Sequence, residues 1–383
     1  MFAKLRPVGS PVPKPQAVGE FVPPWDEYYT ALYTGSGTEA LSLAVELALA
    51  VKPEVARPEV IIPAYGCPDL IAAVVAQQAT PVLVDFAHGL PFLDDEGIAS
   101  ILNENTVAVV AVDFLGGHER LQALSRLCLE AGIVLIEDSA QCFPPASAGH
   151  DLADFVVLSF GRGKPINLMG GGALLTRRRN SSSLERLRSQ YPTGALRTNL
   201  KWRTKRLVFN ALLSRFVYPL LERIPFLHLG ETRFQALRAI RILDIPSSLL
   251  SAGINTFYQR QPIHCFYDKE LAFLERRGWQ LPRNADSSGQ FPRLRYALLA
   301  PDRNVRDEAL EELNYHGIGA NKFYGRILSE IIDTQALRVG GDGNYPNASD
   351  FAARLLTLPT HEGVTVADLN RIVSVLKGVG SQN

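Results

Sequence analysis

The stretch Ser-Phe-Gly-Arg-Gly-Lys at residues 159–164 decides the fold of this chain, together with three consecutive glycines at 170–172. It follows the apolar run Phe-Val-Val-Leu at 155–158, which has the length and composition of a buried strand. The lysine therefore lies between a buried strand and a glycine-rich loop, where its side chain can be held in a fixed and partly dry position. An earlier apolar strand ends in the acidic sequence Ile-Glu-Asp-Ser-Ala-Gln at 136–141.

Lys164 and Asp138 together indicate one kind of chemistry. A lysine in a partly dry site can act as an amine nucleophile toward an aldehyde. A lysine that forms a Schiff base and an acid that pairs with a pyridinium nitrogen are what pyridoxal 5′-phosphate (PLP) requires from a protein. Taken singly, each residue has a simpler interpretation, as a surface lysine or as an aspartate in a helix cap or salt bridge. Their order and spacing favour the PLP site.

A third part of such a site is the sequence Gly-Ser-Gly-Thr at 35–38, which precedes an expected helix. Small residues at a helix N-terminus let backbone N–H groups approach an anion, and the helix dipole favours negative charge there. Thr38 adds a hydroxyl donor, and Ser159 is placed at a strand end to donate to the same phosphate. The alternatives are that 35–38 only makes a turn and a cap, and that Ser159 only bonds backbone.

The composition is that of a globular enzyme. Of 383 residues, 46% are hydrophobic and 20% charged. Lys and Arg total 39, as do Asp and Glu, and this balance argues against a dedicated nucleic-acid binder, which would be basic. The four cysteines lack metal-like spacing, so we interpret them as reduced thiols of a cytoplasmic protein. We expect neither a signal peptide nor a membrane-spanning helix, because no apolar run is long enough.

Apolar strands alternate with helices along the first half of the chain. This alternation predicts an α/β fold with a mainly parallel sheet that is covered on both faces. The expected strands lie at 60–63, 81–85, 107–112, 133–136, 155–159 and 173–176, and the expected helices at 39–51, 69–77 and 120–131. Residues 181–260 read as mostly helical. We divide the chain into a proline-rich N-terminal arm (1–24), a large domain (25–255) and a smaller C-terminal α+β domain (256–383).

The motifs in this order resemble the DegT/DnrJ/StrS family of fold-type-I PLP enzymes, the sugar-nucleotide aminotransferases. The resemblance covers roughly residues 30–380. Its specific part is the pair Glu-Asp-x-Ala-Gln at 137–141 and Ser-Phe-x-x-x-Lys at 159–164. Supporting motifs are Ser-Gly-Thr-Glu-Ala-Leu at 36–41, Pro-Ala-Tyr-Gly-Cys-Pro at 63–68, the glycine-rich run at 170–176 and Leu-Pro-Thr-His-Glu-Gly-Val-Thr at 358–365.

The resemblance implies a role for each matching residue in an αβα PLP-binding domain that works as a homodimer. Lys164 forms the Schiff base and moves the proton, Asp138 pairs with the pyridine nitrogen, and Gln141 contacts the 3′ oxygen. The phosphate is held by Thr38, Ser159 and the backbone at Gly37 and Glu39.

Three departures from the family pattern fall around the substrate. The family has an aromatic ring that stacks on the cofactor where strict register puts Cys67, and we expect Tyr65 to supply the ring instead. The Asn-x-Arg segment that reaches the partner's phosphate is replaced by 239–244, which has Arg241 but no Asn. The usual His-x-Tyr-Gly is Asp-Phe-Leu-Gly at 113–116.

The segment 202–229 is unusually apolar and basic for this fold. At helical spacing it predicts an apolar stripe edged by cations, and basic amphipathic helices can lie on anionic membranes. One interpretation is a helix in a subunit interface or over the active site. The other is contact with a membrane or a lipid-bearing substrate.

We therefore expect a PLP-dependent aminotransferase that moves an amino group from a donor such as glutamate to a nucleotide-linked keto sugar, as in polysaccharide biosynthesis. One alternative is a PLP aminotransferase for a hydrophobic or lipid-linked ketone. A second is a non-catalytic relative that acts as a regulator or assembly partner. We expect a cytoplasmic protein with small-molecule substrates, no metal and no nucleic-acid partner.

Overall fold

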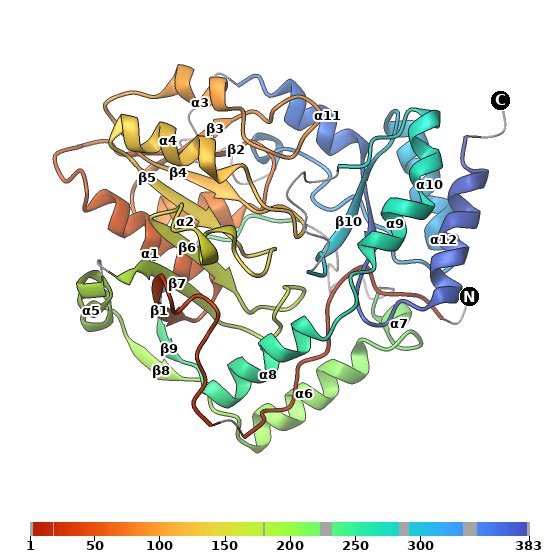
Figure 1. The fold of residues 1–383 in the computed structure, drawn as a ribbon, viewed down its shortest axis with the longest axis horizontal. Coiled ribbons are helices and arrows are strands. Elements are labelled where there is room, and N and C mark those ends of the chain that lie inside the picture. The colour runs from red at the N-terminus through yellow and green to blue at the C-terminus, as the bar shows by residue number, and fades with distance from the viewer. Residues whose placement is uncertain are drawn as a thin grey trace.

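A nine-stranded sheet forms the centre of the larger part of the molecule (Figure 1), in the order β3-β2-β4-β5-β6-β7-β1-β9-β8. The computed structural model describes residues 3–17, 19–178, 181–222, 232–282, 291–331 and 343–380. The strands are β1 (Tyr29–Thr34), β2 (Glu59–Pro63), β3 (Thr80–Val84), β4 (Thr106–Val112), β5 (Val134–Asp138), β6 (Phe155–Ser159), β7 (Gly172–Arg177), β8 (Thr193–Ala195) and β9 (Ile242–Asp244).

Helices fill most connections between these strands, as the sequence predicts for a parallel sheet. They are α1 (Gly37–Leu49), α2 (Asp69–Ala76), α3 (Asp95–Ile101), α4 (Leu121–Ala131), α5 (Ser181–Gln190), α6 (Leu200–Leu212), α7 (Tyr218–Glu222) and α8 (Ser247–Tyr258). Strands β3, β2, β4, β5 and β6 run parallel, whereas β7 is antiparallel to both β6 and β1. The predicted mainly parallel sheet is confirmed. The expectation of mostly helix over 181–260 missed β8 and β9.

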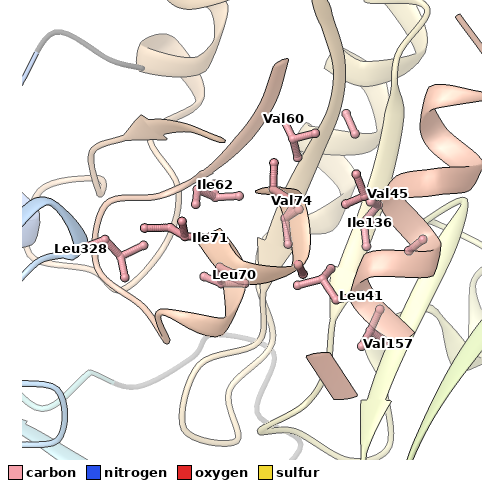
Figure 2. Close-up of a cluster of buried hydrophobic side chains, with 14 of the residues drawn as sticks. Leu41, Val45, Val60, Ile62, Leu70, Ile71, Val74, Ile136, Val157 and Leu328 are labelled. Atoms are coloured by element: carbon pink, nitrogen blue, oxygen red, sulfur yellow. The ribbon is translucent and has the colours of Figure 1, made fainter. Parts of the chain in front are cut away.

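Both faces of the sheet are buried, because alternate residues of one strand point to opposite sides. On β4, Ala108 and Val110 pack into one apolar cluster while Val109 and Ala111 pack into another. Figure 2 shows the first cluster, in which Leu41 and Val45 of α1 and Leu70 and Val74 of α2 lie against the strands. The sheet is thus a rigid platform that fixes the ends of its strands.

A smaller two-stranded antiparallel sheet, β10 (Arg295–Leu299) with β11 (Leu355–Pro359), forms the C-terminal part. Its main helices are α9 (His264–Glu270), α10 (Arg303–Tyr315), α11 (Pro346–Arg354) and α12 (Val366–Gly378). Thr365 caps α12 and forms the predicted capping box with Asp368. This confirms the smaller α+β unit, while the boundaries at 24/25 and 255/256 stay predictions.

The N-terminal arm is bound along the protein surface rather than free (Figure 1). The side chain of Asn210 on α6 accepts from the Val12 N–H at 2.8 Å and donates to the Val12 carbonyl at 3.1 Å. The buried Asn167 amide donates to the Ser10 carbonyl at 2.7 Å. The arm therefore ties α6 to the loop that carries Lys164. Among the helices of the described residues, none is long and apolar enough to cross a membrane.

Candidate active site

One pocket brings together most of the residues singled out from the sequence. It lies where β4, β5 and β6 end and α1 begins, which is the edge at which open α/β sheets bind ligands. Six of the predicted residues line it: Gly37, Thr38, Asp138, Gln141, Ser159 and Lys164. Its other walls are Leu41, Cys67, Asp69, Leu70, Val112 and Ala140. Two of the eight predicted residues, Glu39 and Tyr65, are not among them.

Lys164 sits in the loop between β6 and β7, and glycines shape that loop. Gly163, Gly170 and Gly171 have φ values of 75°, 150° and 97°, which side-chain-bearing residues rarely adopt. A Cβ on Gly172 would lie 2.5 Å from the carbonyl oxygen of Ser36. The glycine run therefore lets β7 pass directly beneath the start of α1. This close approach brings the lysine loop and the helix N-terminus to one pocket.

Asp138 is the last residue of β5, and its side chain is 8% exposed. Its Oδ1 accepts from the Ala140 N–H at 3.0 Å. Burial raises the pKa of Asp138, and the positive charge of Lys164 opposes that rise. A carboxyl group held this way, with no arginine or lysine bonded to it in the described chain, is available to pair with a protonated ring nitrogen.

Gln141 is held in one orientation by two hydrogen bonds. Its Oε1 accepts from the Leu115 N–H at 3.3 Å, and its Nε2 donates to the Tyr324 hydroxyl at 3.0 Å. Tyr324 belongs to the C-terminal part, and its hydrogen bond to Gln141 was not predicted from the sequence. It lies 183 residues from Gln141, so no local motif could reveal it.

The start of α1 is built to receive an anion. Gly37 packs so closely on Ser159 that a Cβ at position 37 would lie 2.7 Å from the Ser159 Cβ. The first N–H groups of a helix lack partners within the helix, so those of Gly37 and Thr38 are donors for a ligand in this pocket. The Thr38 hydroxyl donates its one proton to Asp69 Oδ2 at 2.9 Å, so in this structure the donor that Thr38 offers to a ligand is its backbone N–H.

Glu39 does not line the pocket, and its hydrogen bonds are made within the protein. Its N–H donates to the Ser36 hydroxyl at 3.2 Å, and its Oε2 accepts from the N–H groups of Gly35 at 3.1 Å and Arg241 at 2.8 Å. Both groups are thus used within the protein, so Glu39 braces the anion-binding turn rather than facing the pocket. The backbone of Arg241, in the segment where the family carries Asn-x-Arg, reaches this turn in the same chain.

Tyr65 is not brought to the pocket wall. Its ring is buried among Phe86, Phe114, Tyr324 and Phe351, with centroid distances of 5.3 to 6.1 Å. Cys67 lines the pocket instead, and burial raises the pKa of its thiol to about 12. The position at which the family has a stacking ring therefore presents a small neutral thiol to the ligand.

Asp113, the residue found where the family has histidine, also turns away from the pocket. Its side chain is buried. One carboxylate oxygen accepts a hydrogen bond from the Glu119 N–H at 2.9 Å, and the other accepts one from the Ser139 hydroxyl. Burial and the neighbouring Glu137 raise the pKa of Asp113 well above its usual value. This pair of carboxyl groups forms a buried support beneath the strand end that carries Asp138.

A mainly parallel sheet with an amine, a buried acid and an anion cradle at one edge defines the class of fold-type-I PLP transferases. The chain belongs to the DegT/DnrJ/EryC1/StrS aminotransferase family, whose model matches residues 26–214 and 248–377.

Individual relatives agree with this assignment. The chain is 31% identical over 145 residues to UDP-2-acetamido-2-deoxy-3-oxo-D-glucuronate aminotransferase of Pseudomonas aeruginosa. The matched region covers 37% of this chain and only 39% of the length of that protein. This chain is also 24% identical over 355 residues to dTDP-4-dehydro-2,3,6-trideoxy-D-glucose 4-aminotransferase of Saccharopolyspora spinosa. That match covers 89% of this chain and 82% of the relative.

Solved structures show the same fold. 3-Amino-5-hydroxybenzoic acid synthase superposes with a TM-score of 0.66 at 17% identity and covers 91% of this chain and 85% of the other. NtdA from Bacillus subtilis, solved with bound pyridoxamine phosphate (PMP), superposes with a TM-score of 0.63 at 18% identity. The match covers 94% of this chain and 77% of the other.

Proposed function

We propose that the protein is a PLP-dependent aminotransferase that moves an amino group from an amino-acid donor to a keto sugar. The observation that carries the proposal is the convergence of Lys164, Asp138 and the start of α1 on one pocket. An amine, an acid and an anion cradle are the three groups that this cofactor needs from a protein.

The residues present fit PLP. Lys164 would hold its aldehyde carbon as a Schiff base, and Asp138 its ring nitrogen. Gly37, Thr38 and Ser159 would hold its phosphate, and Gln141 its 3′ oxygen. When bound, the cofactor supplies an electron sink that makes the proton beside an amino group removable. Once the amino group of the donor has taken the place of Lys164 on the cofactor, the freed Lys164 amine would be the base that accepts and returns that proton, and the charge of Asp138 would keep the ring nitrogen protonated.

A nucleotide-linked keto sugar is the acceptor class that the relatives favour. Two of them act, by their names, on UDP- and dTDP-linked sugars. Glutamate is the donor we propose. A purely non-catalytic role is disfavoured, because a protein without chemistry has no need to place Lys164 and Asp138 in one pocket.

The experiment that tests this function is a half-reaction screen. The PLP-loaded protein is expected to lose its visible absorbance on addition of glutamate and to recover it with a keto sugar nucleotide. Recovery with UDP-, dTDP- or GDP-linked keto sugars, and not with simple hydrophobic ketones, supports the proposal. Recovery only with hydrophobic ketones would contradict the keto-sugar acceptor and support the alternative, a hydrophobic or lipid-linked ketone. A protein that takes up no PLP would contradict both.

We also propose that the protein is a cytoplasmic homodimer. Cys67, Cys128 and Cys142 are free thiols, in keeping with a reducing compartment. Light scattering after size-exclusion chromatography is expected to give twice the chain mass of 42.0 kDa.

The segment 202–229 adds a proposal about localisation. Its described part forms α6 and α7, while Arg223–Leu229 lies outside the described residues. Leu207 and Val208 on α6 and Phe216 beyond it are between 54% and 69% exposed. The opposite face of α6, with Trp202 and Asn210, packs on the body of the protein and the arm. The helix therefore has a second apolar face that the described part of the chain leaves uncovered.

We propose that an anionic lipid surface covers this face. Residues 200–212 contain Lys201, Arg203, Lys205 and Arg206 and no acid. A two-fold contact would place such a face against its own copy, so cation would meet cation. Anionic lipid complements the charge and accepts the apolar stripe, and each cation contributes roughly 1 kcal/mol near such a surface. Residues 215–247 lie outside the family match, so α7 is not part of what the family model covers.

Introducing an acid on this face should abolish vesicle binding. We expect Leu207→Asp and Val208→Asp to lower flotation with phosphatidylglycerol-containing vesicles about tenfold or more, because they remove apolar contact and add repulsion. Leu129→Asp, at an 81% exposed leucine on α4, is the matched control and should bind as the wild type does. If the α6 variants instead change the oligomeric state and leave vesicle binding intact, the face is a subunit interface.

A further inference from the structure

An arginine at the start of strand β10 and another just before this strand lie next to the large part of the molecule. Alternate residues of a strand face opposite sides. Tyr296 and Leu298 pack into the C-terminal core, whereas Ala297 and Leu299 pack on the cluster that contains Tyr65 and Phe114. Arg295 shares the second face, since it is two residues from Ala297. Arg293 lies before the start of β10, and a Cβ on Gly116 of the large part would lie 2.8 Å from its Cα.

Both guanidinium groups are buried without a carboxylate. Arg293 and Arg295 are each 7% exposed. Arg295 Nη1 donates to Thr357 Oγ1 at 3.3 Å, its Nε has no hydrogen-bond partner, and its guanidinium lies 5.0 Å from the centre of the Phe323 ring. Arg293 Nη2 likewise has no partner. Throughout the described ranges, neither arginine forms an ion pair.

Two other buried arginines of the described chain have a carboxylate partner, whereas the buried Arg260 also lacks an ion pair there and has an unpartnered Nε. Arg6 pairs with Glu362 at 2.5 Å and Arg306 with Asp307 at 2.6 Å. An uncompensated buried charge is costly, and proteins normally supply a partner for it. Burial accordingly lowers the pKa of Arg295 to about 10, opposed only by the tyrosines Tyr324, Tyr218 and Tyr65. The missing anion is therefore expected to come from a ligand.

Neither arginine lines the pocket, but both lie against residues 115–116, and Leu115 is one of the residues that hold Gln141. Arg295 stacks on Phe323, whose ring is 4.1 Å from that of Tyr324, and the Tyr324 hydroxyl accepts from Gln141. The N–H of Arg295 donates to the Leu115 carbonyl at 3.3 Å, and the Leu115 N–H donates to Gln141. Arg293 lies near Cys142, the residue after Gln141, where its charge opposes the rise in pKa that burial causes.

We propose that Arg293 and Arg295 bind a carboxylate of the amino-acid donor. Arginine presents paired N–H groups that match a carboxylate, and such charge-assisted bonds are strong in a buried site. A carboxylate is compact enough for two arginines buried to this extent, whereas a sugar diphosphate needs a wider and more open surface. The inference rests on the proposed aminotransferase function and adds to it the residues that select the donor.

The test separates the two half-reactions. For Arg295→Met and Arg293→Met, we expect the efficiency of the glutamate half-reaction to fall about 100-fold or more, because a buried charge pair is lost. The keto-sugar half-reaction, started from the PMP form, should change less than about threefold because no donor carboxylate takes part. Arg295→Lys keeps the charge and should recover part of the loss. Arg306→Met, which removes a buried arginine that already has a carboxylate partner, is the control.

A binding measurement makes the result independent of turnover. Glutarate titrated calorimetrically into the cofactor-free protein should bind the wild type and Arg306→Met but not Arg295→Met. Loss of both half-reactions to the same degree, or unchanged glutarate binding in Arg295→Met, would overturn the proposal. Failure of the proposed function is a separate outcome, in which the wild type takes up no PLP while the glutarate titration still reports on the arginines.

Discussion

Replacing Lys164 by alanine is expected to lower transamination by about four orders of magnitude or more, close to 5.5 kcal/mol of transition-state stabilisation. In the proposed function this amine both anchors the cofactor and moves the proton, and among the described residues no other lysine lines the pocket. Asp138 and the start of α1 remain in place, so the variant should still bind PLP, but reversibly. Single-turnover rates with glutamate measure the loss.

The covalent link gives a second readout. Borohydride treatment of the PLP-loaded wild type should fix the cofactor to the peptide that contains Lys164, as mass spectrometry can detect. The same treatment of Lys164→Ala should label no peptide. Lys269→Ala, which removes a surface lysine, should behave as the wild type does. Covalent labelling of a different lysine in the wild type would show that Lys164 is not the residue that forms the Schiff base.

The residues found from sequence are those that a strand end or helix start positions by itself. Asp138 and Ser159 end β5 and β6, and Thr38 lies in the first turn of α1. In a parallel sheet such ends meet at one edge, so the motifs alone bring these side chains together. Gln141 and Lys164 follow in the short connections from the same strands. Local sequence was sufficient to predict that these five residues come together in one pocket.

The rest depended on contacts between distant segments. Tyr324 reaches Gln141 from the C-terminal part, and Tyr65 is drawn into the aromatic cluster between the two parts rather than toward the pocket. The Glu39 carboxylate accepts from the N–H of Arg241, 202 residues away, a contact that no local motif reveals. The short strands β8 and β9 were likewise missed, since runs of three residues carry no periodic pattern.

Gly37→Ala is expected to lower PLP affinity about 100-fold, equivalent to about 2.7 kcal/mol. The new Cβ would lie 2.7 Å from the Ser159 Cβ and 2.9 Å from its Oγ, so the first turn of α1 and the end of β6 must separate. Both sides of that contact line the pocket, and overpacking of this kind costs about 1–3 kcal/mol before any ligand contact is lost. Equilibrium dialysis measures the PLP affinity. Gly194→Ala is the control, because a Cβ there meets nothing within 4 Å.

Two further measurements assign this loss to the phosphate cradle. Pyridoxal lacks the phosphate, so the preference of the wild type for PLP over pyridoxal should shrink in Gly37→Ala while pyridoxal binding changes little. Ser159→Gly removes both atoms that the new Cβ would strike, so Gly37→Ala should cost less affinity in that background than in the wild type. An equal loss in both backgrounds would show that Ser159 is not what Gly37 makes room for. In that case the closeness of α1 to β6 would have no part in holding the phosphate.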